Sequence, residues 1–329
     1  MPSLQQKSSR VSTLMFGLLA LLFSAGGVHA QQKFPAKPIR LIVPAAAGDQ
    51  LDIQARRMAP TLTESFGQPV VVDNRPGDNY LIGTKIAISA NPDGYTVILV
   101  ASSYYASAAF YKLPYDSLND VTPIALVGVS GFVVALHPLL PVTNIQELIA
   151  HDKANPGKLR YGAAGTGSGS HRAAELFNQM AGTKLTNVPY QSIPFAVNDL
   201  LGGQIQIFFG NLPTMIPQIK SGRLRGIAVT TAKRSNVLPE IPTVGETVSG
   251  YEAVAGPGLL GPKGLPKDIV VRWNNEVNRI GQLPDVRDRL ASFGIDTVDG
   301  SPAQFHAFIK REIEKWQKVV KVAGIKPER

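Results

Sequence analysis

A glycine-rich loop near the middle of the chain carries the strongest signal for ligand binding. Residues 165–171 read Gly-Thr-Gly-Ser-Gly-Ser-His, follow an apolar run and open a predicted helix. Glycine lets backbone N–H groups approach a ligand closely, hydroxyls add donors, and a helix start carries partial positive charge. These properties suit an anion such as a carboxylate; the alternative is a glycine-rich turn without a ligand. The predicted contacts are Gly165, Thr166, Gly167, Ser168 and His171.

The loop after the first apolar run, residues 44–52, has the same character. Backbone amides are expected to be accessible at its small residues, which are Ala45, Ala46, Ala47 and Gly48. Asp52 is expected to cap the helix that follows. Asp49 is either solvated or a partner for a cationic or hydroxyl group of the ligand, because an acid beside an anion-binding loop opposes a carboxylate.

Further candidate residues follow other apolar runs or lie in the loop at 78–81. They are Ser103, Tyr104, Gly210, Asn211 and Tyr80. The carboxyl ends of parallel strands meet at one edge of a sheet, and ligands bind outside that edge. Tyr104 would offer a ligand a flat apolar face and a hydroxyl, and the alternative is that it packs in the core.

Motifs for catalysis and for nucleotide or metal binding are absent from the sequence. It contains no G-x-S-x-G nucleophile elbow, no HExxH and no Walker Lys-Ser/Thr pair, and the dinucleotide fingerprint fails at Ser170. Cysteine is absent, which excludes thiol nucleophiles, disulfides and CxxC zinc sites. The histidines are scattered, and we expect His171 to be a helix-start residue rather than a base. The sequence therefore predicts a binding protein, not an enzyme, and calls for no cofactor.

The elements that position these residues alternate between strands and helices. Strands are predicted at 39–43, 69–72 and 95–100, with helices at 51–66 and about 82–90 between them. Further strands are predicted near 132–136, 158–162, 188–190, 205–209 and 226–229, with helices at about 145–154 and 171–181. A last amphipathic helix begins with a capping box at Ser301 and Gln304. This alternation is typical of parallel sheets covered by helices.

The predicted fold class is α/β, with two α/β lobes and a ligand cleft between them. A length of 329 residues is consistent with two domains. We assign residues 31–129 and 254–329 to lobe 1 and residues 130–253 to lobe 2, so the chain crosses between the lobes twice. The candidate loops then converge at the carboxyl ends of the two sheets.

Residues 1–30 have the pattern of a signal peptide. Lys7 and Arg10 precede an apolar run at 14–23, and Val28-His29-Ala30 is a cleavage signature, so the mature chain is expected to start at Gln31. An uncleaved anchor is the alternative, but the run is shorter than the roughly 20 residues that a membrane span needs. The sequence therefore predicts an exported protein.

The charge of the chain gives little support for nucleic-acid binding. Its net charge is +9, and removal of two basic leader residues leaves 31 basic and 24 acidic residues, or +7. The Lys and Arg residues are scattered without a basic run or a nucleic-acid-binding signature. We interpret most of this charge as solvated surface.

A series of short motifs, taken in order, resembles the tripartite tricarboxylate transporter substrate-binding proteins, the Bug family. Examples are Pro-Asp-Gly-Tyr-Thr at 92–96 and Asn-Pro-Gly-Lys-Leu at 155–159. The remaining motifs lie at 34–44, 67–77, 113–116, 165–168, 188–190, 199–204 and 241–244, so that the resemblance covers nearly the whole mature chain. Each motif is weak alone, but the ordered set is highly specific.

The resemblance implies a periplasmic-binding-protein fold and a periplasmic protein that delivers a small organic carboxylate to the permease subunits of a tripartite tricarboxylate-type transporter. It also implies that the loops at 44–52 and 165–171 hold the carboxylates, largely through backbone amides and bridging water. The chain departs from the family pattern at Ala45–Ala47, Asp49, Leu51, Tyr80 and Gly210. From these departures we expect an aromatic or dicarboxylic acid rather than citrate. We also expect the protein to be a monomer.

Two other functions remain open at this point. A sensor component could use the same fold to present a ligand to a membrane kinase, and the neighbouring genes would discriminate between permease and kinase. A secreted α/β hydrolase could assemble a Ser–His–Asp triad in space, although the missing nucleophile elbow argues against it. Recovery of unchanged ligand after incubation would exclude the hydrolase.

Overall fold

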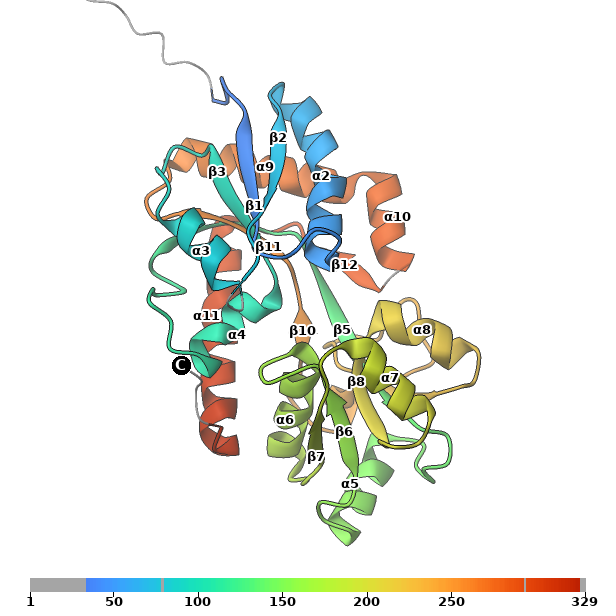
Figure 1. Cartoon of the computed structure of the whole chain (residues 1–329). Helices are drawn as coiled ribbons and strands as arrows, with labels where there is room; N and C mark the ends of the chain where they lie inside the picture. The colour runs from blue at the N-terminus through green and yellow to red at the C-terminus, as the bar shows by residue number, and fades with distance from the viewer. Residues whose placement is uncertain (1–33, 78–79, 293, 326–329) are drawn as a thin grey trace, which may run out of the picture. The chain divides into compact units, whose positions relative to one another are not determined.

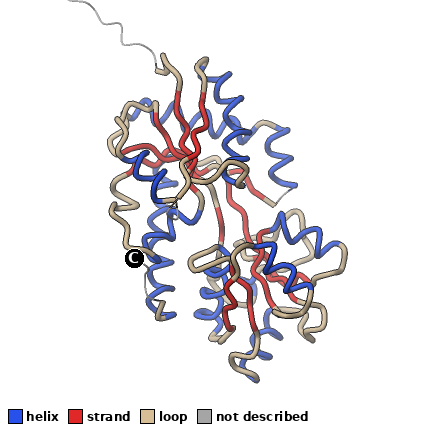
Figure 2. The backbone as a smooth tube through the Cα atoms, in the orientation of Figure 1, coloured by secondary structure: helices blue, strands red, loops and turns tan. Residues whose placement is uncertain are grey.

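Two mixed β-sheets form the framework of the protein (Figures 1 and 2). The computed structural model describes residues 34–77, 80–292 and 294–325, and both sheets belong to the unit Lys37–Arg329. The predicted signal peptide and its cleavage site lie outside the described residues. Helices cover the sheets, which confirms the two-lobed α/β fold class.

The first sheet has the strand order β2-β1-β3-β11-β4. These strands are β1 (Ile39–Val43), β2 (Val70–Asn74), β3 (Thr96–Val100), β4 (Val121–Leu126) and β11 (Gly258–Pro262). β1 runs parallel to β2 and β3, as the strand–helix alternation predicts, whereas β11 is antiparallel to β3 and β4. The apolar side chains of β1 are almost completely buried because helices cover both faces of a parallel sheet.

The second sheet has the strand order β10-β5-β8-β6-β7, and β9 and β12 also pair with β5. Its strands are β5 (Gly128–Leu136), β6 (Arg160–Ala163), β7 (Thr186–Pro189), β8 (Ile207–Asn211), β9 (Arg225–Val229), β10 (Val254–Ala255) and β12 (Ile295–Thr297). The long strand β5 has two halves. Residues 128–131 pair with β12 and β10, and residues 132–136 pair with β8 and β9.

The chain passes directly from one sheet to the other at two short segments, and it changes sheets again between β11 and β12. Val127 separates β4 of the first sheet from β5 of the second, and Gly256-Pro257 separates β10 from β11. Because β12 returns to pair with β5, three separate segments of the chain meet near the start of β5. The assignment of whole lobes to residues 130–253 and to the flanking segments remains a prediction.

The helices that follow the parallel strands β1, β2 and β3 of the first sheet, and β6, β7 and β8 of the second, begin at the carboxyl edge of their sheet. With the first sheet go α2 (Gln50–Phe66), α3 (Leu81–Ile88), α4 (Ser102–Phe110), α9 (Lys267–Gln282), α10 (Pro284–Ser292) and α11 (Pro302–Ala323). With the second go α5 (Ile145–Ala154), α6 (Gly169–Ala181), α7 (Ile193–Leu201), α8 (Leu212–Lys220) and a 3₁₀ turn at Val244–Glu246. The predicted capping box at Ser301 and Gln304 is confirmed, since each side chain bonds to the backbone N–H of the other.

The C-terminal helix α11 joins the cores of the two sheets. It packs against α4 and also against α6. Phe305 and Ile309 belong to a core cluster with the residues of β3, while Trp316 and Val320 belong to the cluster around β6 and β8. The apolar face predicted for this helix is therefore shared between two cores.

Candidate functional site

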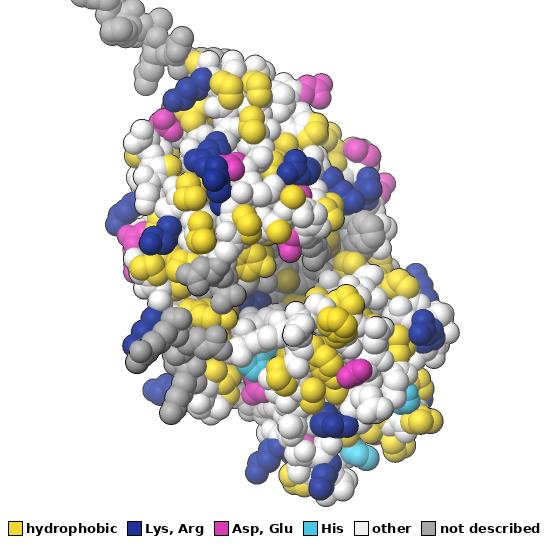
Figure 3. Space-filling model, in the orientation of Figure 1, with side chains coloured by type: hydrophobic (Ala, Val, Ile, Leu, Met, Phe, Trp, Pro, Cys, Tyr) yellow, Lys and Arg dark blue, Asp and Glu magenta, His cyan; other side chains and the backbone are white. Residues whose placement is uncertain are grey.

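Two adjoining cavities, of about 270 and 340 Å³, lie where the carboxyl ends of strands from both sheets meet (Figure 3). We call them together the cleft. Asp49, Tyr80 and Ser102 come from loops and helix starts after β1, β2 and β3, and Ala164 and Asn211 lie at the ends of β6 and β8. Both cavities are lined by Tyr80, Ala101, Ser102, Ala164, Ser168 and Gly169.

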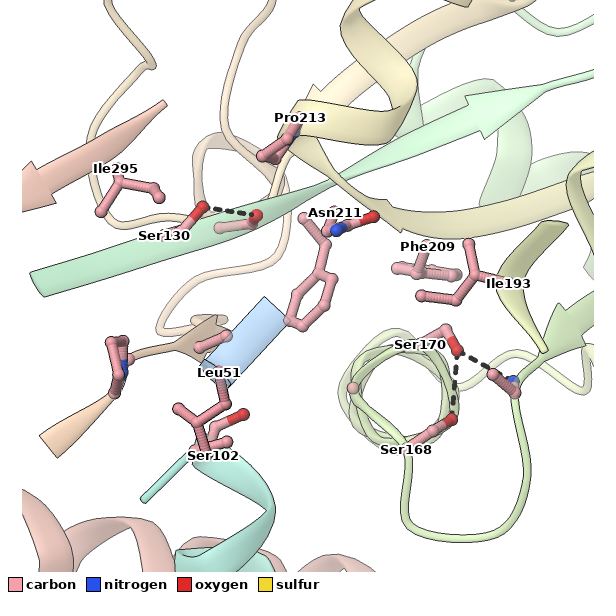
Figure 4. A pocket seen from close by; sticks show the side chains of 18 of the residues that line it. Leu51, Ser102, Ser130, Ser168, Ser170, Ile193, Phe209, Asn211, Pro213 and Ile295 are labelled. Atoms are coloured by element: carbon pink, nitrogen blue, oxygen red, sulfur yellow. Dashed lines mark hydrogen bonds between the residues drawn. The ribbon is translucent and has the colours of Figure 1, made fainter. Parts of the chain in front are cut away.

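The lining of the cleft divides into hydroxyl and amide groups and an apolar part. Figure 4 shows Ser102, Ser168 and Ser170 around the same space as Asn211. The apolar part consists of Leu51, Phe132, Ile193, Phe208, Phe209, Pro213 and Ile295. This combination of a few polar groups with an apolar wall is typical of sites for small organic molecules.

Helix N-termini from both sheets converge on the cleft. The residues that precede the first turns of α2, α3, α4, α6 and α8 all line it, and they are Asp49, Tyr80, Ala101, Ser168 and Asn211. The first amides of a helix have no carbonyl partner within the helix, and each helix start carries roughly half a positive charge. At α3, α4 and α8 no side chain caps the helix. The cleft is therefore suited to an anion.

The glycine-rich loop is held in place by the first turn of α6. Gly167 donates its N–H to Nδ1 of His171 over 3.0 Å, and Ser168 Oγ accepts the N–H of His171 over 3.3 Å. Since these amides are occupied within the loop, the first-turn amides of Gly169 and Ser170 are the ones available to a ligand. Thr166, Gly167 and Ser168 line the cleft, as expected.

His171 supports the loop and does not line the cleft. Its ring is buried beside Phe110 and Tyr161. Burial, with a contribution from the Arg172 charge, lowers the pKa of His171 to about 4, so the imidazole is neutral near pH 7. The His171 imidazole positions Gly167 by accepting its backbone N–H at Nδ1. This agrees with the prediction that His171 is a helix-start residue rather than a base. The sequence predicts a contact between His171 and the ligand, but the side chain does not reach the lining of the cleft.

The loop at 44–52 brings fewer residues to the cleft than the sequence predicts. Asp49 lines it, whereas Ala45, Ala46, Ala47 and Gly48 do not. Asp49 is also the N-cap of α2, because its Oδ1 accepts the N–H of Leu51 over 2.9 Å. The prediction that Asp52 caps this helix is therefore wrong.

Asp52 instead stabilises the conformation of the loop at 44–52 through hydrogen bonds. It is buried and accepts the N–H of Gly48 over 2.8 Å and the amide of Asn74 over 2.9 Å. It also pairs with Arg56. These bonds, first of all that from Gly48, lower the pKa of Asp52. A carboxylate with this many partners is a structural group rather than a ligand contact.

The two candidate tyrosines have different roles. Tyr80 lines both cavities, with burial and the Asp49 charge raising its pKa. Tyr104 is 4% exposed and lies in the core, where its hydroxyl donates to the carbonyl of Ser117 over 2.9 Å and its ring stacks on Tyr115. The prediction that a ligand stacks on Tyr104 is therefore corrected: Tyr104 packs in the core, which was the alternative. Ser103 does line the cleft.

Asn211 faces the cleft, whereas its neighbour Gly210 does not. Successive residues of a strand point to opposite faces, and Gly210 is buried under α8, where a Cβ would overlap the Met215 side chain. The glycine is thus needed for packing. Asn211 Oδ1 is buried and has no hydrogen-bond partner among the described residues. Gly165, like Gly210, is absent from the lining.

Arg172 is a cleft residue that the sequence analysis missed. It is 2% exposed, and its guanidinium donates to the carbonyl and the hydroxyl of Ser102 over 3.0 and 3.1 Å. It also lies over the Trp316 ring, and burial lowers its pKa to about 10. The sequence did contain an indication of this role. An arginine in the first turn of a helix opposes the helix dipole, so it needs a stabilising partner elsewhere in the structure. Arg172 ties α6 to the start of α4.

Metal binding finds no support in the described part of the chain. No cluster of three or more His, Asp or Glu side chains there could hold an ion. Within those same residues, no helix combines the length and hydrophobicity required to cross a bilayer. The polar lining of the cleft consists of hydroxyl, amide and backbone groups, the Asp49 carboxylate and the buried guanidinium of Arg172.

Comparison with known proteins identifies the family. The profile of the family described as "Tripartite tricarboxylate transporter family receptor" matches residues 54–325. The chain belongs to this family. It is 35% identical over 323 residues to Protein BugT of Bordetella pertussis, covering 95% of this chain and 98% of that protein. The resemblance to the Bug family is thus confirmed, and members of the family are periplasmic solute-binding proteins.

Solved structures of related receptors share the fold. R. palustris Rpa4515, solved with adipate, has 33% identity and a TM-score of 0.75, and the match covers 90% of this chain and 100% of that one. MatC from Rhodopseudomonas palustris, solved with bound malate, has 27% identity and a TM-score of 0.71 over 87% of this chain and 100% of that one. Adipate and malate are both carboxylates.

Proposed function

We propose that this receptor captures a small organic carboxylate in the cleft and delivers it to the permease subunits of a tripartite tricarboxylate-type transporter in the periplasm. The convergence of helix N-termini from both sheets is the observation that carries the proposal. Rpa4515 with adipate and MatC with malate support the ligand class. The role as a transport receptor follows from the family.

The lining of the cleft narrows the class of carboxylate. Ser102, Ser168 and Ser170 offer hydroxyls beside the helix starts, while Phe132 and Phe209 form an apolar wall. A carboxylate with an apolar aliphatic or aromatic body matches both parts. A third carboxylate, as in citrate, would leave one charge against the aromatic wall or near Asp49, where it is disfavoured.

Binding of the mature chain to adipate, malate, benzoate, citrate and uncharged adipamide tests the proposal. A ligand at about 100 times its dissociation constant should stabilise the protein by about 2.7 kcal/mol, which a thermal shift detects. We expect adipate or benzoate to bind and adipamide not to bind.

A pair of glycine variants locates the site. Gly169→Val should abolish binding because a Cβ at Gly169 would lie 2.6 Å from the Phe132 ring and intrude into the cleft. Gly202→Val is the matched control, since the nearest atom to a Cβ there is 3.4 Å away and the residue lies outside the cleft. Equal carboxylate affinity in both variants, or binding of adipamide as tight as adipate, would contradict the proposed site.

A further inference from the structure

A separate cavity of about 310 Å³ lies between α2, α9 and α10. Figure 1 shows these helices beside one another at the first sheet. Its volume falls at the lower end of the range for small-molecule sites, about 300–1,000 Å³. Val127 and Pro257, from the two segments where the chain passes directly from one sheet to the other, form part of its wall.

The interior of this cavity is apolar and only partly covered. Its apolar lining consists of Met58, Val127, Val277, Ile280, Val286, Leu290 and Ile295. None of the described residues of α10 is buried, and Val286 and Leu290 on its inner face stay partly exposed. A helix that leaves its apolar side chains over a hollow gains stability when an apolar group fills that hollow.

The rim of the cavity carries an excess of positive charge. Arg57 and Arg289 line it together with a single carboxylate, that of Asp285. Neither guanidinium forms an ion pair or side-chain hydrogen bond with another residue that the structure describes. Guanidinium groups bind carboxylates through paired hydrogen bonds, so an anionic group at this rim would find two unoccupied partners.

We propose that this cavity is a second small-molecule site, distinct from the cleft, for an amphipathic monocarboxylate with an aliphatic body. The alkyl chain lies against Ile280 and Leu290, and the carboxylate lies between Arg57 and Arg289. The site contains none of the helix starts that line the cleft. Its existence therefore does not depend on the proposed transport function.

Octanoate binding to the mature chain, measured by calorimetry, tests the proposal. We expect each methylene added from hexanoate to octanoate to tighten the dissociation constant about fourfold, because burying one methylene contributes about 0.8 kcal/mol. We expect 1-octanol, which lacks the charge, to bind at least about tenfold more weakly than octanoate.

Variants distinguish the cavity from the cleft, which shares Gln54, Pro257 and Ile295 with it. Leu290→Trp fills the hollow, and the double change Arg57→Gln and Arg289→Gln removes the charge without altering the interior. Each should weaken octanoate binding at least tenfold. Arg287→Gln, on α10 but outside the cavity, should leave octanoate binding unchanged. Gly169→Val, which blocks the cleft, should retain the octanoate binding that belongs to the cavity.

The proposal is overturned if the double arginine variant binds octanoate as tightly as the wild type. It is equally overturned if Gly169→Val abolishes octanoate binding, since octanoate would then occupy the cleft. Should Leu290→Trp fail to fold, the arginine variant and the chain-length series still decide the outcome. Failure of the cleft to bind adipate or benzoate would leave these results unaffected, so the two proposals fail separately.

Discussion

Acidification should destabilise the fold through His171. The imidazole is buried, and its Nδ1 accepts the N–H of Gly167, which requires an unprotonated nitrogen. Burial first, and then the Arg172 charge, lower the pKa of His171 from its usual 6.5 to about 4. Protonation therefore opposes both burial and the bond that holds the glycine-rich loop.

The sign of the effect follows from proton binding. Between pH 6.5 and 4 the unfolded chain binds a proton at His171 that the folded chain does not, so the free energy of unfolding falls as the pH falls. One pKa unit corresponds to about 1.36 kcal/mol. The His171 contribution should thus cost about 2 kcal/mol between pH 7 and 5, and about 3 kcal/mol once the pH is below 4.

Urea denaturation of residues 31–329 at pH 7, 6 and 5 measures this loss. Carboxylates also titrate at low pH, so the comparison is with His171→Asn, whose side-chain oxygen can accept the Gly167 N–H and does not titrate. The wild type should lose about 2 kcal/mol more than His171→Asn between pH 7 and 5. Ser168→Ala weakens the same helix start but retains the imidazole, and it should keep the wild-type pH slope.

Parallel pH profiles for the wild type and His171→Asn would refute this reasoning. They would mean that His171 binds its proton equally well in the folded and unfolded chains. The imidazole would then have access to water or to a partner that accepts its proton. In that case Gly167 would not depend on a neutral His171, and the account of the glycine-rich loop would fail with it.

Three further changes test the roles assigned to particular residues. Ser168→Ala removes the N-cap of α6 and a cleft hydroxyl, so urea denaturation should show a loss of about 1 kcal/mol and calorimetry weaker carboxylate binding. Tyr104→Phe leaves the Ser117 carbonyl without its donor and should cost about 1 kcal/mol of stability, but carboxylate affinity should not change; a large loss of affinity would return Tyr104 to the site. Gly210→Ala should lower the free energy of unfolding by about 1–3 kcal/mol because its Cβ overlaps Met215, and an unchanged urea midpoint would argue against that packing.

The sequence predicted best those elements whose local signals agree. The helix at 145–154 is observed at Ile145–Ala154, where Asn144 caps the first turn. The strand at 39–43 is observed as β1 with the same bounds. In both cases apolar spacing, end signals and burial point to one structure, so little depends on distant parts of the chain.

The candidate site was predicted less well because side-chain direction depends on where each helix begins. The sequence places residues 102–105 at the carboxyl edge of the sheet without predicting a helix there, and α4 begins at Ser102. That start turns Ser102 and Ser103 to the cleft and Tyr104 into the core. If a helix begins one residue earlier or later, each side chain is rotated by about 100° around the helix axis. Local sequence patterns do not determine the first residue of a helix to that precision.

Contacts between segments that lie far apart in the chain could not be predicted from local sequence patterns. β11 lies between β3 and β4 although it follows them by more than a hundred residues, so its antiparallel position could not be read from neighbouring strands. Arg172 is similar, because its partner Ser102 lies 70 residues earlier in the chain. Only the position of an arginine in the first turn of a helix indicated that a distant partner had to exist.

In the proposed function, the geometry of the cleft would let a chain with scattered basic residues select an anion. Exposed lysines and arginines are screened by salt and attract anions of any shape. Helix starts and the buried Arg172 instead place fixed positive potential at one end of a partly apolar space. A carboxylate placed there keeps its hydrogen bonds while its body contacts Phe132 and Phe209. Selectivity then comes from the direction of donors on two separate sheets, so it depends on the fold as a whole rather than on net charge.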